Sequence, residues 1–258
     1  MTPLLKEVNF SNPLFVIDVG NTSLTCGFIK NGRLTRVKTV IHDNIPKFIK
    51  KLSSSGIITS YDVIIACVVP KILRFIKNEF NGTSIRKMWV SGENLPIKLN
   101  HKYFDLKRLG VDRRVNIFGA LRRFGAPCLI FDFGTALTVD YIARNGVFEG
   151  GLIIPGPQVA LQALAQKTAL LPKNLRLPAH APASLGRNTR DCMKAGILEG
   201  YGAMAEGLMT RFKKRYGKNL RVIATGGFSK TVQRYVKGFD VIDPHHTLKS
   251  LALLWASR

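Results

Sequence analysis

The sequence has few features of a membrane or exported protein. Among its 258 residues the longest apolar runs, such as 63–69, have only the length of a strand and are too short to cross a bilayer. The first residues lack the basic segment and long apolar stretch of a signal peptide. We therefore expect neither a signal peptide nor a membrane span, and a cytoplasmic location.

Cysteine and histidine are also scarce. The four cysteines (Cys26, Cys67, Cys128 and Cys192) lie far apart and form no Cys-x-x-Cys pair. The five histidines show no His-x-x-x-His or equivalent spacing. These patterns argue against a structural zinc site and predict reduced, mostly buried thiols of a cytosolic protein.

Acidic residues are few as well. The chain has 16 Asp and Glu against 39 Lys and Arg, which gives a net charge of +23. The basic residues are spread along the chain, with a modest concentration at 211–221, and no RNA-binding motif, zinc finger or basic tail accompanies them. The charge therefore favours anionic substrates or a generally basic proteome, while a polyanionic partner such as nucleic acid stays open as the less favoured alternative.

The most informative feature is an internal repeat. Leu14–Leu34 and Cys128–Phe148 follow the same pattern at an offset of 114 residues: an apolar run, then Asp-x-Gly, then an Asn-Gly turn. Four pairs coincide without a gap: Asp18 with Asp132, Gly20 with Gly134, Asn31 with Asn145, and Gly32 with Gly146. The duplication predicts two related lobes.

Each copy suggests a phosphate-binding turn. A buried strand ends in an aspartate, a glycine lets the backbone turn sharply, and hydroxyl or amide residues follow. Successive backbone N–H groups in such a turn can hold phosphate oxygens, and the aspartate can hold Mg²⁺ beside them. A purely structural role, in which Asp18 and Asp132 accept hydrogen bonds from their own turns, is the alternative. The duplication favours the functional interpretation.

Between and after the copies, predicted strands alternate with predicted helices, which indicates an α/β layer fold. The expected strands after each hairpin are 33–40, 63–69, 86–90 and 220–224. The expected helices are 45–52, 71–79, 112–124, 159–166, 189–215 and one that begins at Ser229.

Small residues mark one face of the long helical segment 189–215. They are Gly196, Gly200, Ala203 and Gly207, at spacings of four, three and four. Glycine inside a helix costs about 1 kcal/mol relative to alanine, so repeated glycines on one face need a reason. We expect tight helix packing on this face, between subunits; a locally flexible helix is the alternative.

A third glycine turn, Thr225-Gly226-Gly227, follows the strand 220–224. Together with the turns at Asp18 and Asp132 it supplies what a nucleotide cleft between two duplicated lobes needs. Two of the turns could clamp phosphates, and the third could pass beneath adenosine.

The ordered motifs resemble those of the type III pantothenate kinases. The motifs are Asp18-Val19-Gly20-Asn21-Thr22, Gly110-Val111-Asp112-Arg113, Asp132-Phe133-Gly134-Thr135, Gly150-Gly151 with Pro155-Gly156, and Gly186-Arg187-Asn188-Thr189. The resemblance covers the chain after residue 13. It implies an α/β fold of two duplicated, ribonuclease H-like lobes of the actin-like ATPase type, 13–126 and 127–258, with a nucleotide cleft between them. It also implies a homodimer and the ATP-dependent phosphorylation of pantothenate, the first step of coenzyme A biosynthesis.

The resemblance also implies roles for individual residues. Asp112 would be the catalytic base, and Asp132 would bind a monovalent cation, K⁺ or NH₄⁺, while ATP would come with Mg²⁺. The implied ATP contacts are Asp18, Val19, Gly20, Asn21, Thr22, Ser23, Leu24, Thr25 and Thr135. The implied pantothenate contacts are Tyr103, Gly110, Val111, Asp112, Arg113 and Thr189. The family usually has alanine where Val111 stands.

The residues themselves are compatible with this chemistry. Phosphoryl transfer to an alcohol needs positioning, charge neutralisation and a carboxylate that accepts the hydroxyl proton. Asp112 could be that carboxylate or a helix N-cap, and Arg113 could bind a substrate carboxylate in a fork or be a solvated arginine. Tyr103 could be a core or surface aromatic, and Thr189 a helix N-cap.

Three functional hypotheses follow. A pantothenate kinase is the leading one. A nucleic-acid-associated regulator on the same fold is motivated by the charge, since fold does not fix function. A related kinase for another small alcohol is the third.

Overall fold

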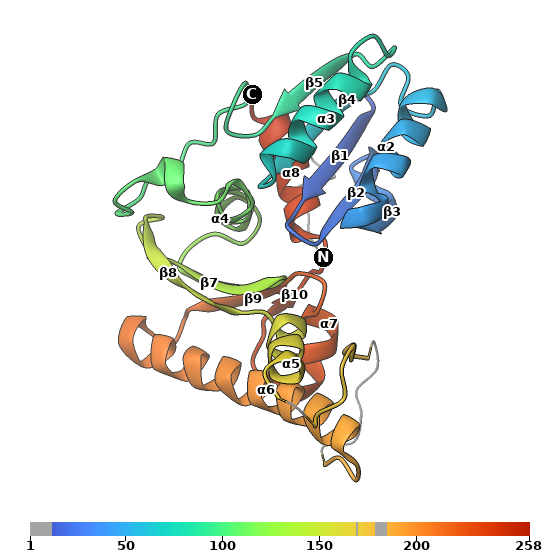
Figure 1. Ribbon diagram of the computed structural model, residues 1–258. Coiled ribbons are helices and arrows are strands. Elements are labelled where there is room, and N and C mark those ends of the chain that lie inside the picture. The colour runs from blue at the N-terminus through green and yellow to red at the C-terminus, as the bar shows by residue number, and fades with distance from the viewer. Residues whose placement is uncertain (1–11, 169, 179–184) are drawn as a thin grey trace. The chain divides into compact units, whose positions relative to one another are not determined.

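The computed structural model describes residues 12–168, 170–178 and 185–258. These residues form two compact units (Figure 1). Unit 1 contains the described residues up to Gly125 together with His246–Arg258, and unit 2 contains Ala126–His245.

Unit 1 is built on a five-stranded sheet in the order β3-β2-β1-β4-β5. Its strands are β1 (Leu14–Val19), β2 (Ser23–Lys30), β3 (Arg33–Ile41), β4 (Asp62–Cys67) and β5 (Lys87–Val90). The first three are antiparallel neighbours, whereas β4 runs parallel to β1 and β5 parallel to β4. The apolar runs in β1 and β4 are buried because both strands lie inside the sheet.

Helices cover both faces of this sheet. They are α2 (Ile45–Ser54), α3 (Pro70–Phe80), α4 (Val111–Phe124) and α8 (His246–Ala256), with short 3₁₀ turns at His42–Asn44 and Leu106–Arg108. Alternate residues of β1 point to opposite faces. Phe15 and Ile17 pack with α2 and α3, and Leu14 and Val16 pack with α4 and α8.

Unit 2 repeats this sheet. Its order is β10-β9-β6-β7-β8, with β6, β7 and β8 antiparallel and β9 and β10 added in parallel to β6. Its strands are β6 (Cys128–Phe133), β7 (Ala136–Ile142), β8 (Phe148–Pro155), β9 (Arg221–Thr225) and β10 (Val241–Ile242). Its helices are α5 (Pro157–Gln166), α6 (Thr189–Tyr216) and α7 (Ser229–Val232), followed by a 3₁₀ turn at Gln233–Tyr235. The predicted duplication is confirmed.

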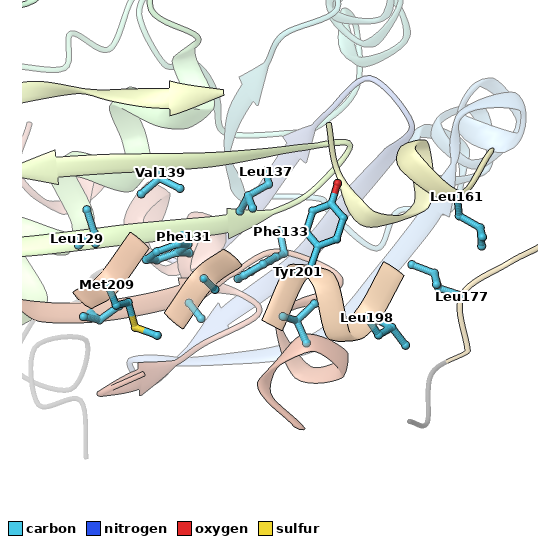
Figure 2. Close-up of a cluster of buried hydrophobic side chains, with 14 of the residues drawn as sticks. Leu129, Phe131, Phe133, Leu137, Val139, Leu161, Leu177, Leu198, Tyr201 and Met209 are labelled. Carbon is cyan, nitrogen blue, oxygen red and sulfur yellow. The ribbon is translucent and has the colours of Figure 1, made fainter. Parts of the chain in front are cut away.

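The core of unit 2 lies between one face of its sheet and α5 and α6. Phe131 and Phe133 from β6 face Met209 and Tyr201 from α6 in this core (Figure 2). Tyr201 is mostly buried, and its hydroxyl donates a hydrogen bond to the carbonyl oxygen of Pro155. The core therefore joins the long helix to the edge strand β8.

The two hairpins are not equivalent at their turns, although the sequence motifs align without a gap. Val19 pairs with Leu24 and leaves four residues in the first turn, whereas Phe133 pairs with Leu137 and leaves three. The difference is made up at the other end. Asn31 and Gly32 both have positive φ in a two-residue turn, whereas the loop 143–147 is longer and only Gly146 has positive φ. A gap-free alignment of the two copies is therefore wrong between the Asp-x-Gly turn and the Asn-Gly turn. It is correct again from the Asn-Gly turn onward.

The last helix packs on the first unit. We expected residues 127–258 to form the second lobe, but α8 packs against α4, β1 and β4. This helix is apolar around most of its circumference and almost wholly buried, as its Leu251 and Trp255 illustrate. A boundary drawn from the repeat alone cannot detect a chain that returns to its first unit.

The helices α4 and α8 approach each other most closely at Gly119. A side-chain carbon at this position would overlap the Ser250 hydroxyl and lie 3.1 Å from the Ser250 Cα atom. The approach therefore requires glycine.

None of the described helices is both long and apolar enough to cross a membrane.

Gly119→Ala should lower the free energy of unfolding by about 1–3 kcal/mol, because the added methyl group overpacks a helix contact. Urea denaturation measures the loss. On a Ser250→Gly background the same substitution should cost less, since the overlapping side chain is gone. An equal cost on both backgrounds would show that the contact with Ser250 is not the reason for the glycine.

Candidate functional site

The first predicted turn follows β1. Asp18 is half-buried on β1, opposite Thr25 of β2. The Gly20 N–H donates a 2.9 Å hydrogen bond to the Ser23 carbonyl, which closes the turn. Asn21 and Thr22 at its tip are exposed. The turn therefore presents an amide, a hydroxyl and backbone groups beside a strand-end carboxylate.

Not every residue of this motif can offer its side chain to a ligand. The side chains of Val19 and Leu24 are fully buried in the core of unit 1, so only their backbone atoms can take part. Thr25 places its hydroxyl 3.1 Å from the Thr39 hydroxyl on β3. Within this motif Asn21 and Thr22 are exposed, and Asp18, Gly20 and Ser23 are half-buried.

The proposed base lies in the first turn of α4. Gly110 is the N-cap residue of that helix, so Asp112 is not the N-cap that we considered as its alternative role. Its Oδ1 accepts a 2.8 Å hydrogen bond from the Arg113 N–H. A side-chain carbon on Gly110 would overlap this same oxygen. Glycine at position 110 is therefore a condition for the observed position of the carboxylate.

The residues around Asp112 differ in exposure. Arg113 is 7% exposed, which contradicts the solvated alternative for this arginine. Burial lowers the pKa of the Arg114 guanidinium, and the negative charge of Asp112 opposes that shift. The Val111 side chain packs in the core that includes α8. The difference between this valine and the alanine usual in the family therefore affects the core. Tyr103 is half-buried in the loop that precedes α4.

The second predicted turn follows β6. Asp132 is half-buried on that strand, and the Gly134 N–H donates to the Ala136 carbonyl at 3.1 Å. Gly156, the N-cap residue of α5 directly after β8, supports this turn: its N–H donates to the Thr135 carbonyl at 2.9 Å. A side-chain carbon on Gly156 would overlap the carbonyl oxygens of Gly134 and Thr135.

The third turn packs directly on the second. Gly226 has a φ of 87°, and a side-chain carbon there would overlap Asp132 Oδ1 and lie 2.7 Å from the Phe133 nitrogen. The Phe228 N–H also donates to the Phe133 carbonyl at 3.1 Å. The structure thus brings Asp132, Thr135 and the third turn together. The sequence motifs identified each turn but not the contacts between them. Gly156 and Gly226 were the residues in the sequence that could have indicated such close contacts.

Thr189 lies at the start of α6. It is the first helical residue and is exposed, whereas the N-cap is Asn188, whose Oδ1 accepts a 3.0 Å hydrogen bond from the Asp191 N–H. The N-cap role that we considered for Thr189 therefore belongs to Asn188. Gly186 packs its backbone against the first turn of the same helix.

Burial makes two of the four cysteines unreactive. Burial raises the pKa of the Cys26 and Cys128 thiols to about 12 each, so neither is a nucleophile near neutral pH. Cys67 is half-buried and Cys192 exposed, so only two of the four thiols are buried as expected.

The described residues contain no group of three or more His, Cys, Asp or Glu arranged for a metal ion. Mg²⁺ bound together with nucleotide phosphates needs only one or two carboxylates, because phosphate oxygens and water complete its coordination. A single strand-end aspartate, Asp18, beside an exposed turn therefore fits that ion.

Comparison with solved structures identifies the fold. MreB5 of Spiroplasma citri bound to ADP matches with a TM-score of 0.50 at 10% identity, over 96% of this chain and 97% of that one. A conserved candidate Baf family transcriptional activator from Campylobacter jejuni matches with a TM-score of 0.57 at 17% identity, over 94% and 98%. These likenesses establish the fold, and they confirm the predicted α/β architecture of two duplicated, actin-like ATPase units.

Comparison of sequences defines the family. The model of the type III pantothenate kinase family matches residues 14–211. A type III pantothenate kinase from Bacillus cytotoxicus is 35% identical over 252 residues, which cover 94% of this chain and 95% of the relative. The chain belongs to the type III pantothenate kinase family.

The packing of the third turn on Asp132 can be tested by two neighbouring substitutions. Gly226→Ala should lower thermal stability by about 1–3 kcal/mol, because it strains a positive φ and overlaps Asp132 and Phe133. Gly227→Ala is the matched control, since no atom lies within 4 Å of a side-chain carbon there. Thermal denaturation of both variants measures the effect. Equal melting temperatures would contradict the described contact.

Proposed function

We propose that this chain phosphorylates pantothenate with ATP to give 4′-phosphopantothenate, the first step of coenzyme A biosynthesis. Membership of the type III pantothenate kinase family supports this activity. The observation that carries the mechanism is the position of Asp112 in the first turn of α4, where a glycine makes room for its carboxylate.

Asp112 would act as the general base. Its Oδ1 is held by the Arg113 N–H, and among the described residues no donor contacts Oδ2. Oδ2 can therefore accept the proton of the pantothenate hydroxyl while the hydroxyl oxygen bonds to the γ-phosphorus of ATP and the bond to the leaving ADP breaks.

Binding of the two substrates would use the remaining motif residues. The exposed turn 20–23 and Thr135 would contact the phosphates of ATP, and Asp18 would hold Mg²⁺ or its waters. Mg²⁺ would neutralise charge on the transferred phosphoryl group. Arg113 would bind the pantothenate carboxylate. The other proposed contacts with pantothenate are Tyr103, Gly110, Val111 through its backbone, and Thr189.

Asp132 would bind the monovalent cation, K⁺ or NH₄⁺. Its carboxylate is half-buried and lies beside the third turn at Gly226. A carboxylate oxygen in that position could bind such a cation. A cytoplasmic location, predicted from the sequence, stays a prediction, as does the less favoured nucleic-acid partner.

Asp112→Asn should reduce kcat at least about 100-fold, because general-base catalysis is lost while the side chain keeps its shape. A coupled assay for ADP with pantothenate, Mg²⁺ and K⁺ measures turnover, and circular dichroism checks the fold. Turnover near the wild-type value would remove Asp112 as the base.

The same assay tests the role of Asp132. Equal turnover of the wild-type enzyme with Na⁺ in place of K⁺ would argue against cation binding by that residue.

Gly110→Ala separates the position of the carboxylate from its presence. The added carbon meets only the flexible end of Asp112, so the fold should hold while the carboxylate is displaced. We expect kcat in the same assay to fall with little change in melting temperature. An unchanged kcat would mean that the described carboxylate position is not the catalytic one.

We further propose that the protein is a homodimer formed through the small-residue face of α6. Gly196, Gly200, Ala203 and Gly207 are all exposed in the single chain. Side-chain carbons at the three glycines would meet no described atom within 4 Å. Gly202, two residues from Gly200, instead packs against the Tyr235 backbone. The open face lets the backbone of a second helix approach closely, which the alternative of a flexible helix does not explain.

Gly200→Leu should convert the dimer to a monomer, because the larger side chain prevents that approach. In an isolated chain the same change should leave the fold intact, since the position is exposed and leucine is the better helix former. Analytical ultracentrifugation measures the mass, and circular dichroism the fold. A wild-type monomer, or a variant that stays dimeric, would contradict the proposal.

A further inference from the structure

Unit 1 contains a cavity that no proposed step of the kinase reaction uses. Its volume is about 320 Å³, within the range of small-molecule sites. Trp89 of β5, Phe118 of α4 and Leu254 of α8 form apolar parts of its wall. None of the motif residues of the two phosphate turns lines it.

The cavity is strongly basic. Lys98, Arg122 and Arg258 line it, and among the described residues that form its wall none carries a carboxylate side chain. Within the described part of the chain, none of these three cations forms an ion pair with an acidic side chain. Three cationic side chains therefore line a partly apolar space to which no described acidic side chain contributes, which favours an anionic ligand.

Two of the cations are held in place by aromatic rings. The Arg258 guanidinium lies 3.8 Å from the centre of the Trp255 ring and 5.2 Å from that of Trp89, and it donates a 2.7 Å hydrogen bond to the Trp255 carbonyl. The Arg122 guanidinium lies 5.5 Å from the centre of the Phe118 ring. Such contacts fix the guanidinium groups before a ligand arrives and so reduce the entropy lost on binding.

We propose that this cavity binds a small organic phosphate with a flat or apolar body, of the nucleoside monophosphate class. The phosphate would interact with Lys98, Arg122 and Arg258, since guanidinium groups bind phosphate oxygens in a fork. The apolar body would lie against Trp89, Phe118 and Leu254. A ligand here would contact the helix that carries Asp112, about 9 Å along the axis from Phe118. The proposal does not depend on the assigned kinase activity.

The test is calorimetric titration of the full-length protein with adenosine monophosphate. The kinase site is first saturated with a non-hydrolysable ATP analogue and pantothenate. We expect one saturable binding event, weakened about tenfold by Arg122→Gln, because a charge-assisted contact is lost. Inorganic phosphate should bind more weakly, and adenosine should show no saturable binding. No binding of the monophosphate, or equal affinity in the wild type and Arg122→Gln, would overturn the proposal.

A second basic cavity supplies the matched control. It measures about 240 Å³ and lies at β1, β2, β3 and α2. Its lining includes Arg36 and Lys38 of β3 and Lys51 of α2. Lys51→Gln removes the same charge there and should leave the affinity unchanged. A loss of binding in Lys51→Gln and not in Arg122→Gln would place the ligand in that cavity and overturn the proposal.

The tryptophans report the location directly. The sequence has two, Trp89 and Trp255, and both lie against the Arg258 guanidinium. Binding in the proposed cavity should change the tryptophan emission at the same midpoint as the heat signal. Heat without an emission change would place the ligand elsewhere and overturn the proposal. Binding of adenosine or inorganic phosphate as tight as that of the monophosphate would also overturn it.

Discussion

The architecture of unit 1 depends on the close approach of α4 and α8 at Gly119. Because a side chain there would overlap Ser250, the two helices reach their observed separation only through glycine. At that separation α8 supplies much of the core on one face of the sheet, including Leu251 and Trp255. The same contact holds α4, and α4 carries Asp112 in its first turn. The position of the proposed base is therefore set by a contact two turns further along its helix.

Buried polar groups fix the alignment of these helices. The Arg123 guanidinium lies 2.6 Å from His246 Nδ1, and His246 Nε2 lies 2.9 Å from the Asn116 carbonyl. A guanidinium can only donate, so Nδ1 must accept and Nε2 must carry the proton that it donates to Asn116. The Thr247 hydroxyl also donates to the Asn116 side chain at 2.9 Å. A sliding of α8 would leave these buried groups unpaired, which costs more than their pairing gains.

This set of bonds also joins the two ends of unit 1 that connect to the rest of the chain. Arg123 lies two residues before the chain leaves the unit at Gly125, and His246 is the residue at which it returns. Their hydrogen bond holds both connections to one point of unit 1. The return could not be predicted from the repeat, because α8 has no counterpart in the repeated pattern and its apolar sequence fits any buried position.

Features with a local signature were predictable from the sequence. The apolar run 63–69 became β4 at Asp62–Cys67, and the periodic segment 189–215 became α6 at Thr189–Tyr216. Contacts between distant residues were not predictable. Gly200 and Gly202 stand two residues apart in one helix, yet the first is open and the second touches the Tyr235 backbone. Helical periodicity places them on different faces, but only the packing shows which face is covered.

The glycines of the motifs show why the two copies of the hairpin are unequal. At Gly20 the nearest atom to a side-chain carbon would be the Ser23 carbonyl oxygen, 3.7 Å away, so the space above the first turn is open. Its counterpart Gly134 is similar, with the Ala136 carbonyl oxygen 3.4 Å away, but Gly156 and Gly226, which lie outside the repeat, pack their backbones against the second turn and leave no room for side chains of their own. An open turn with exposed Asn21 and Thr22 can admit a phosphate group. A turn packed from two sides can hold the Asp132 carboxylate in one place, which would suit the cation site proposed for it. The difference between the two copies therefore comes from segments outside the repeat, which pack on the second turn and not on the first.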